Sequence, residues 1–173
     1  IVPNYNSAEE ILIYADSISY DEDENIIARG KAKIFQMNKL IFSDLIIYNQ
    51  KDDKIILPSK FNFKDQNNNF FQGENGFFEK NLNFAEFENP KIRLNDGSRI
   101  IGKKIKRDGD IDIITKGVYS PCNSRIKIGS FICPTWQLEG EKILHDNKNL
   151  FLYQKHSKMR VINTPVFYIP YLV

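Results

Sequence analysis

Histidine and cysteine are scarce in this sequence, with two residues of each among 173. His145 and His156 stand outside any spacing that binds a catalytic metal, so we expect neither a metal site nor a cofactor. The sequence also lacks the glycine-rich phosphate loop, the Gly-x-Ser-x-Gly elbow and the His-Glu-x-x-His helix. We therefore expect no catalytic residues and a protein that is not an enzyme. One catalytic possibility stays open, a pair of carboxylates for glycoside hydrolysis, because the separation of two carboxylates depends on the fold.

Long apolar runs and an excess of one charge are also missing. No stretch approaches 18 consecutive apolar residues, which excludes a membrane-spanning helix. Lys and Arg number 24 against 22 Asp and Glu, a balance too even to indicate nucleic acid or an anionic membrane. Ala and Leu, which favour helices, are scarce, whereas 13 Phe, 8 Tyr and many Ile favour strands. The chain begins at Ile1 without a basic and apolar leader, so we expect a piece of a longer protein.

Apolar and polar residues alternate along most of the chain. Between Ile26 and Ile34 the even-numbered positions are apolar or small, and the odd positions include Arg29, Lys31 and Lys33. A period of two predicts half-buried strands. Clusters of Asp, Asn, Gly and Lys between these segments predict turns. We expect about ten strands and no long helix.

A strand–turn–strand unit recurs along the chain. Its charged anchor residues are spaced by 28, 30, 29 and 38 positions, and they are Asp16, Asp44, Glu74, Lys103 and Glu141. A period of this size is typical of stacked repeats. The longer last interval predicts an insertion of roughly nine residues, which contains both cysteines. One unit cannot bury its apolar side alone, so neighbouring units must stack and share it.

Stacked units of this kind predict an all-β fold with two sheet walls around a hydrophobic interior, either a closed sandwich or an open V. The residues of shared parity are expected to face inward. They are Ile18, Ile26, Ile34, Phe42, Ile46, Ile55, Leu57, Phe61, Phe63, Phe84, Ile92, Ile105, Ile113, Ile143, Leu150 and Leu152. Periodicity does not decide whether these side chains fill a core or line an apolar groove.

Three further segments stand in a distinctive order. Val118–Cys122 contains Tyr-x-x-Cys, Trp136–Asp146 begins with Trp and ends in His-Asp, and Thr164–Tyr171 reads Thr-Pro-Val-Phe-Tyr-Ile-Pro-Tyr. This order, together with the repeats that begin at Ala15–Asp21, resembles the LptD family of lipopolysaccharide-assembly outer-membrane proteins, also called OstA. The likeness covers essentially the whole chain and corresponds to the N-terminal periplasmic, OstA-like domain of that family.

The resemblance implies a β-jellyroll, or β-taco, over residues 1–163, and an exit segment at 164–173 that leads to a transmembrane β-barrel outside this sequence. It implies a place at the periplasmic face of the outer membrane of a Gram-negative bacterium. The implied partners are an LptA-like bridge protein at the N-terminal edge, continuing from LptC, and an LptE-like lipoprotein with the barrel.

Lipopolysaccharide is the ligand that the resemblance implies. Its lipid A acyl chains would slide along the inward-facing residues, pushed by ATP hydrolysis at the inner membrane. A continuous apolar lining suits this role, because exposing acyl chains to water costs about 25 cal/mol per Å².

The two cysteines leave two pairings open. By resemblance, Cys122 occupies the position at which the family carries a cysteine that bonds to the distant barrel. Cys133, directly before Pro134, has no counterpart that we assign. Either Cys122 and Cys133 form a local disulfide or Cys122 pairs with the barrel. We expect the local disulfide, which would stabilise the fold by roughly 3 kcal/mol.

The repeats are also compatible with two functions other than a conduit. A free-standing LptA-like bridge protein that binds lipopolysaccharide would lack the Tyr-x-x-Cys, Trp and Pro-Tyr motifs. A glycan-binding or adhesin β-solenoid would expose aromatic residues on its surface without a continuous interior stripe. The basic run Lys103–Arg107 either touches lipid A phosphates at the rim or forms a solvated strand face, and we expect the solvated face.

Overall fold

The structure is a computed structural model, and it describes residues 10–121 and 125–173. These residues form strands and turns, and no helix among them is long and apolar enough to cross a membrane. The strands are β1 (Leu12–Tyr14), β2 (Ser17–Tyr20), β3 (Ile26–Gln36), β4 (Lys39–Asn49), β5 (Lys54–Leu57), β6 (Phe61–Lys64), β7 (Phe70–Glu79), β8 (Phe84–Arg93), β9 (Arg99–Ile101), β10 (Lys104–Asp108), β11 (Ile111–Ser120), β12 (Arg125–Ile128), β13 (Phe131–Pro134), β14 (Trp136–Asp146), β15 (Phe151–Val161) and β16 (Thr164–Leu172). The predicted all-β fold is confirmed.

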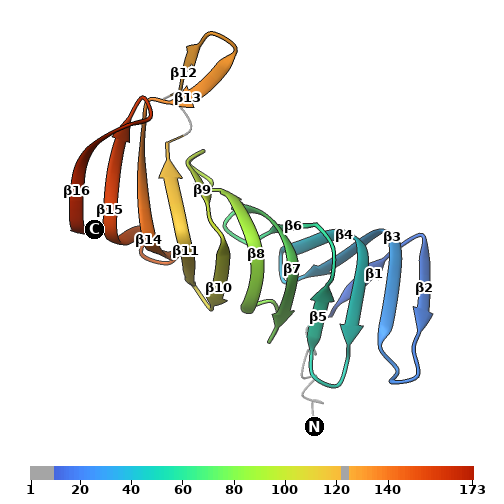
Figure 1. Cartoon of the computed structure of the whole chain (residues 1–173). Coiled ribbons are helices and arrows are strands. Elements are labelled where there is room, and N and C mark those ends of the chain that lie inside the picture. Colours follow the sequence, from blue (N-terminus) through green and yellow to red (C-terminus); the bar gives the residue numbers. More distant parts are fainter. Residues whose placement is uncertain (1–9, 122–124) are drawn as a thin grey trace.

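The strands follow one another through the sheet in chain order. Fourteen of them form a single antiparallel sheet that runs from β1 and β2 at one end to β16 at the other (Figure 1). The remaining two, β12 and β13, form a separate hairpin that projects from the sheet between β11 and β14 (Figure 1). This hairpin lies in the interval where the lengthened repeat spacing predicts an insertion.

The single sheet is folded into two walls. The first half of β4, Leu40–Ser43, pairs with β6, whereas its second half, Ile47–Asn49, pairs with β5. We call one half of the sheet the β6 wall, with β1, β6 and β9, and the other half the β5 wall, with β2, β5 and β10. The long strands contribute a half to each. The walls face each other, because the ring of Phe63 in β6 lies 4.8 Å from that of Phe78, which pairs with β5. The two predicted sheets are thus two walls of one sheet.

The strands bend along one line, which we call the fold line. In the β7–β8 ladder, Glu74 lies between two register shifts, and a third shift separates Arg29 from Ala32 in β3. Bulges of this kind bend a strand and increase its twist. At the bend of β3, Gly30 has a φ of 76°, and a Cβ there would lie 2.6 Å from a carboxylate oxygen of Asp16. A larger residue at this position would therefore be strained, which favours glycine at the bend.

The repeat anchors lie on the fold line. Asp16 separates β1 from β2, Lys103 separates β9 from β10, and Asp44, Glu74 and Glu141 lie within β4, β7 and β14. The chain crosses the line once per strand, so the period near 29 residues corresponds to every second crossing. Crossings interrupt β1/β2, β5/β6 and β9/β10 completely, and the separate hairpin adds β12 and β13. The described chain therefore has sixteen strands where the sequence pattern predicts about ten.

The parity of the inward-facing residues changes at the fold line. In β4, Ile41 and Ser43 are buried before Asp44, and Ile46 is buried after it. If alternation ran unbroken through β4, Phe42 would face the same side as Ile46. The parity changes at Asp44, so the predicted inward position of Phe42 is wrong. The ring of Phe42 faces outward, where Nζ of Lys33 lies 5.8 Å from its centroid.

The predicted inward positions of Phe84, Ile113 and Leu150 are also wrong. Ala85, next to Phe84, and Asp112, next to Ile113, are fully buried, which places Phe84 and Ile113 on the outer face. Leu150 lies in the turn before β15 with a φ of 59° and is 76% exposed. A turn residue with positive φ does not follow the alternation of the strand beside it.

Ile18 and Ile26 lie at the N-terminal end of the sheet, where the walls leave the interior open to solvent. Ile18 is opposite buried Ala28 in the register and shares its inner face. However, Ile18 is 48% exposed, and Ile26 is only half-buried. Their predicted burial is therefore not reached, because no further strand covers β2 within the described chain.

Candidate functional site

The interior between the walls is continuous and apolar. It extends from Ala28 in β3 to Ile143 in β14. Nine of the predicted interior residues are buried in it, namely Ile34, Ile46, Ile55, Leu57, Phe61, Phe63, Ile92, Ile105 and Ile143. Leu152 is half-buried and packs against the same core. The predicted contact of these residues with lipid stays a prediction.

Aromatic rings from both walls fill the centre of this interior. Phe61 of the β6 wall packs edge-on against Phe87 of the β5 wall, with ring centroids 5.0 Å apart. Phe78 packs against both Phe61 and Phe63. Of the two arrangements that periodicity leaves open, the structure therefore shows the filled core. Sequence alternation misses Phe71, Phe78 and Phe87, because the change of parity at the fold line moves them to the inner face.

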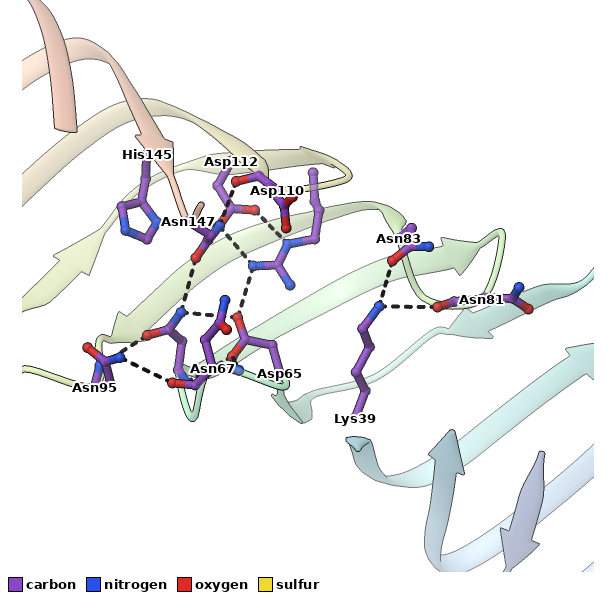
Figure 2. Close-up of polar contacts among 12 residues, drawn as sticks. Lys39, Asp65, Asn67, Asn81, Asn83, Asn95, Asp110, Asp112, His145 and Asn147 are labelled. Carbon is purple, nitrogen blue, oxygen red and sulfur yellow. Dashed lines mark hydrogen bonds and ion pairs between the residues drawn. The ribbon is translucent and has the colours of Figure 1, made fainter. Parts of the chain in front are cut away.

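Opposite the fold line, the turns at the ends of the two walls meet, and we call this contact the mouth seam. Gln36 at the end of β3 donates a hydrogen bond to Asn81 Oδ1 in the β7–β8 turn, at 3.0 Å. The ammonium of Lys39 donates to Asn83 Oδ1 at 2.6 Å and to the carbonyl of Asn81 at 3.3 Å (Figure 2). These bonds join the β6 wall to the β5 wall across the opening.

Arg107 is the central side chain of the mouth seam. Its Nε and Nη2 donate to the two carboxylate oxygens of Asp112 at 2.6 and 2.9 Å. Nη2 also lies 3.4 Å from Oδ2 of Asp65, which follows β6 on the opposite wall. The guanidinium stacks 4.5 Å above the ring of Phe71 and 5.4 Å from that of Phe63. One cation thus links the two walls and covers the aromatic core.

Two asparagines continue the seam beside Arg107. Asn69, before β7, donates to Asn147 Oδ1 at 3.0 Å, and Asn147 donates to Asp112 Oδ2 at 2.9 Å (Figure 2). Asn69 also donates to Asp65. All four side chains are buried, so these hydrogen bonds offset the cost of removing polar groups from water.

The mouth seam shifts the titration of its charged groups. Burial would raise the pKa of Asp112, but the charge and hydrogen bonds of Arg107, with contacts from His145 and Asn147, hold that pKa well below its ordinary value of 3.8. Burial would lower the pKa of Arg107, and the carboxylates of Asp112 and Asp65 raise it instead. Both residues therefore stay charged in the folded protein at neutral pH.

The sequence contains a signal for this ion pair that alternation overlooks. A tight turn at Asp108–Asp110 places Arg107 directly opposite Asp112 in the β10–β11 register. Opposite charges at facing positions of a hairpin stabilise the pair. Alternation assigns polar residues to the outer face, and for this reason it misses the Arg107–Asp112 ion pair. The same assumption places Ile113 wrongly on the inner face.

The basic run Lys103–Arg107 divides between two environments. Lys104 is exposed and forms an ion pair with Glu86, and Lys106 is exposed on the same outer face. For these two residues the expected solvated face is confirmed. Arg107 is buried in the mouth seam, so the expectation is wrong for it.

Residues 164–172 form β16, which pairs along β15, so this segment is a strand of the same sheet. The role predicted for it as an exit segment stays a prediction.

Cys122 lies outside the described residues, and the disulfide with Cys133 stays a prediction. Among the residues that the structure describes, no group of three or more His, Cys, Asp or Glu is placed to hold a metal ion.

Comparison with known proteins supports the resemblance seen in the sequence. The chain is similar to the LPS-assembly protein LptD of Haemophilus ducreyi (strain 35000HP / ATCC 700724), at 23% identity over 172 residues. The matched region covers 94% of this chain but 20% of that protein, so the chain spans about one fifth of the relative's length. The predicted resemblance to LptD is confirmed. No family model matches the chain.

Among solved structures, the chain shows a weaker likeness. The chain is similar to LptH, the LptA homologous periplasmic component of the conserved lipopolysaccharide transport device from Pseudomonas aeruginosa. The sequence identity is 13% and the TM-score is 0.32, with 88% of this chain and 95% of that chain covered.

Proposed function

We propose that this chain is a periplasmic, non-enzymatic domain for lipopolysaccharide transport, which holds acyl chains between its two walls. The likeness to LptD over most of the chain supports this proposal. Because the chain spans about a fifth of that relative, the activity and partners of the whole protein are part of the proposal as well. The proposal also includes the place of action, which is the periplasmic face of the outer membrane.

The observation that carries the proposal is the apolar interior. It crosses the strands from β3 to β14, so its long axis runs through the whole stack of repeats. The charged side chains Lys39, Asp65, Arg107 and Asp112, although buried, gather at the mouth seam and not along the apolar core. An acyl chain moving along this axis would therefore meet apolar surface, as a non-specific slide requires.

Acyl chains can enter only if the walls part. The fold line would act as the hinge, and the mouth seam would open opposite to it. Neutral hydrogen bonds contribute about 1 kcal/mol each, and those to charged groups roughly 1.5–3 kcal/mol. Opening the seam therefore costs several kcal/mol by these values. Burying an acyl chain offsets this cost, at about 25 cal/mol for each Å² of apolar area removed from water.

The ends of the sheet suit the proposed partners. Within the described chain, β1 and β2 pair with β3 alone, and β16 pairs with β15 alone. Among the described residues, each end therefore offers backbone groups that could pair with a further strand. We propose that an LptA-like bridge protein adds its strands at β1 and β2 and delivers lipopolysaccharide there. The acyl chains would then pass toward a membrane barrel, with an LptE-like lipoprotein, beyond β16.

Two phenylalanines provide a matched test of the interior. Phe63 is buried between the walls, whereas Phe42, on the neighbouring strand of the same wall, faces outward. A photo-crosslinking amino acid at Phe63 of the full-length protein should capture lipopolysaccharide in cells. The same amino acid at Phe42 should capture several times less, because acyl chains would contact the inner face alone. Immunoblotting for a crosslinked band that stains for lipopolysaccharide measures both.

Two conditions separate transport from surface adhesion. Capture at Phe63 should require the ATP-driven supply of lipid, because acyl chains enter only when they are delivered. It should also persist at high ionic strength, which weakens attraction to exposed lysines such as Lys31 and Lys33 but not apolar burial. Equal capture at Phe42 and Phe63 would contradict a conduit and indicate a surface-binding module.

A further inference from the structure

The outer face of the β6 wall carries a groove that the proposed conduit does not use. Its volume is about 990 Å³, and it is lined by residues of β6, β7, β8, β9, β11 and β14, by Pro134 at the end of β13, and by the turn residues Asn68, Leu94 and Asn95. A cavity of this size can hold a small ligand. At one end it reaches Asn68 and Asn95, in the turns beside the mouth seam. There the backbone amide of Asn95 donates a hydrogen bond to Oδ1 of Asn69, a residue of the mouth seam.

The groove is strongly basic although the protein is not. Lys64, Lys91, Arg93 and Arg99 line it, and no carboxylate does. The whole chain carries a net charge of only +2. Within the described residues no ion pair is found for these four cations, whereas Lys54 and Lys104 on the outer β5 wall are paired with Glu79 and Glu86.

Like charges face each other inside the groove. In the β8–β9 register Arg93 lies directly opposite Arg99, and Phe70 and Lys64 continue the same row on the neighbouring strands. Two like charges at facing positions destabilise a sheet. An anion between them would turn this repulsion into attraction, and arginine is well suited to bind phosphate with two parallel hydrogen bonds.

The remaining lining favours a saccharide as the carrier of that phosphate. Gln72, Asn68, Asn95 and Gln137 contribute amides, which can both donate to and accept from sugar hydroxyls. Phe70 is 44% exposed and Ile101 is 51% exposed, so both offer apolar surface to the C–H face of a sugar ring. This mixture differs from a purely electrostatic surface, which would bind any polyanion.

We propose that the groove binds a phosphorylated saccharide, as the headgroup of the amphiphile whose acyl chains lie between the walls. This inference rests on the proposed function for the identity of the amphiphile. The position of the groove suits it, because a headgroup that leaves the mouth beside Asn68 and Asn95 can turn over the end of the β6 wall. The basic run at Lys103–Arg107 is a poorer site, since Lys104 is paired and Arg107 is buried.

The test uses a headgroup without acyl chains. The probe is a glucosamine disaccharide that carries two phosphates, titrated into the purified protein by isothermal calorimetry. Replacing both arginines, R93Q/R99Q, should weaken its binding by about tenfold or more, as expected for the loss of charge-assisted hydrogen bonds. The same disaccharide without phosphates should bind the unaltered protein more weakly by a similar factor.

The chain offers a matched control for charge. Lys142 and Lys155 also face each other, in the β14–β15 register, and both are exposed on the outer β5 wall. The variant K142Q/K155Q removes the same charge from an opposed pair outside the groove, and its binding should change less than twofold. Similar losses in both variants would overturn the site, as would a wild-type protein that does not bind the probe. Equally tight, arginine-dependent binding of an acidic peptide would overturn the choice of a saccharide.

Failure of the groove and failure of the conduit give different results. If only the groove is wrong, crosslinking at Phe63 still captures lipopolysaccharide while calorimetry shows no arginine-dependent binding. If only the conduit is wrong, the disaccharide binds through the arginines while Phe63 captures no lipid. Thermal unfolding of R93Q/R99Q checks its fold, and removing the opposed charges should leave the melting temperature unchanged or higher.

Discussion

Arg107 is the residue whose loss should affect the stability of the fold most clearly. It is buried with Asp112 and contacts Asp65 on the other wall. Replacing it in R107M leaves two buried carboxylates without their cation, which should lower the free energy of unfolding by about 3–5 kcal/mol. The double variant R107M/D112L removes the partner charge and should recover much of the loss. Urea unfolding measures both, and a double variant no more stable than R107M would contradict this account.

The same pair predicts how acid affects stability. Arg107 holds the pKa of Asp112 below its ordinary value of 3.8, so the pair stabilises the fold above about pH 4, and this contribution is lost as the pH falls below that value. Without Arg107, burial raises the pKa of Asp112, so acid relieves the unpaired charge in R107M. The stability difference between wild type and R107M should be largest near neutral pH and shrink on acidification. A difference that grows between pH 7 and pH 3 would disprove this assignment.

At the scale of the strand, the fold line depends on glycines where the walls approach. A Cβ on Gly73 would lie 2.2 Å from the ring of Phe87, so G73A should lower the free energy of unfolding by about 1–3 kcal/mol through overpacking. Gly140 is the matched control, also on the fold line but in β14. A Cβ there meets no atom closer than 3.4 Å, so G140A should cost less than about 0.5 kcal/mol. Equal effects on the urea midpoint would argue against close packing at Gly73.

The strands and their stacking could be predicted because they depend on local patterns. Alternation predicts the half-buried strands, and the spacing of Asp16, Asp44 and Glu74 predicts the repeat. The fold line itself could not be predicted, because a strand that bends through a bulge keeps its local pattern on each side but changes which parity faces inward. Phe42 shows the result, since it continues the apolar parity of Ile46 and yet lies on the outer face.

The mouth seam could be predicted only in part. The pairing of Arg107 with Asp112 follows from a tight turn and could have been found. Contacts such as Gln36 with Asn81 join residues far apart in the chain that share no local signal. Their partners depend on how the walls close, which is a property of the folded sheet. The basic groove was missed for the same reason, because Lys64, Arg93 and Arg99 meet only through the register of separate strands.

At the scale of the whole molecule, transport should require the mouth to open. Gln36 and Asn81 contact each other across the mouth seam, so the variant Q36C/N81C in the full-length protein places two thiols there. If a disulfide forms, it should hold the walls together and reduce capture of lipopolysaccharide at Phe63 several-fold, and a reductant should restore capture. The single variant Q36C controls for effects of the reductant on other cysteines. Full capture with the disulfide formed would show that lipid passes without opening the seam.

The meander also determines the order in which the molecule can fold. Each strand of the main sheet pairs with strands that are close to it in chain order, so hairpins can be added one after another. The contacts of the mouth seam are different, since Arg107 meets Asp65 across 42 positions and Asn147 meets Asn69 across 78. These late contacts can form only after several hairpins have assembled. We therefore expect the walls to be built from strand to strand during folding while the mouth is still open, so that the interior is sealed last.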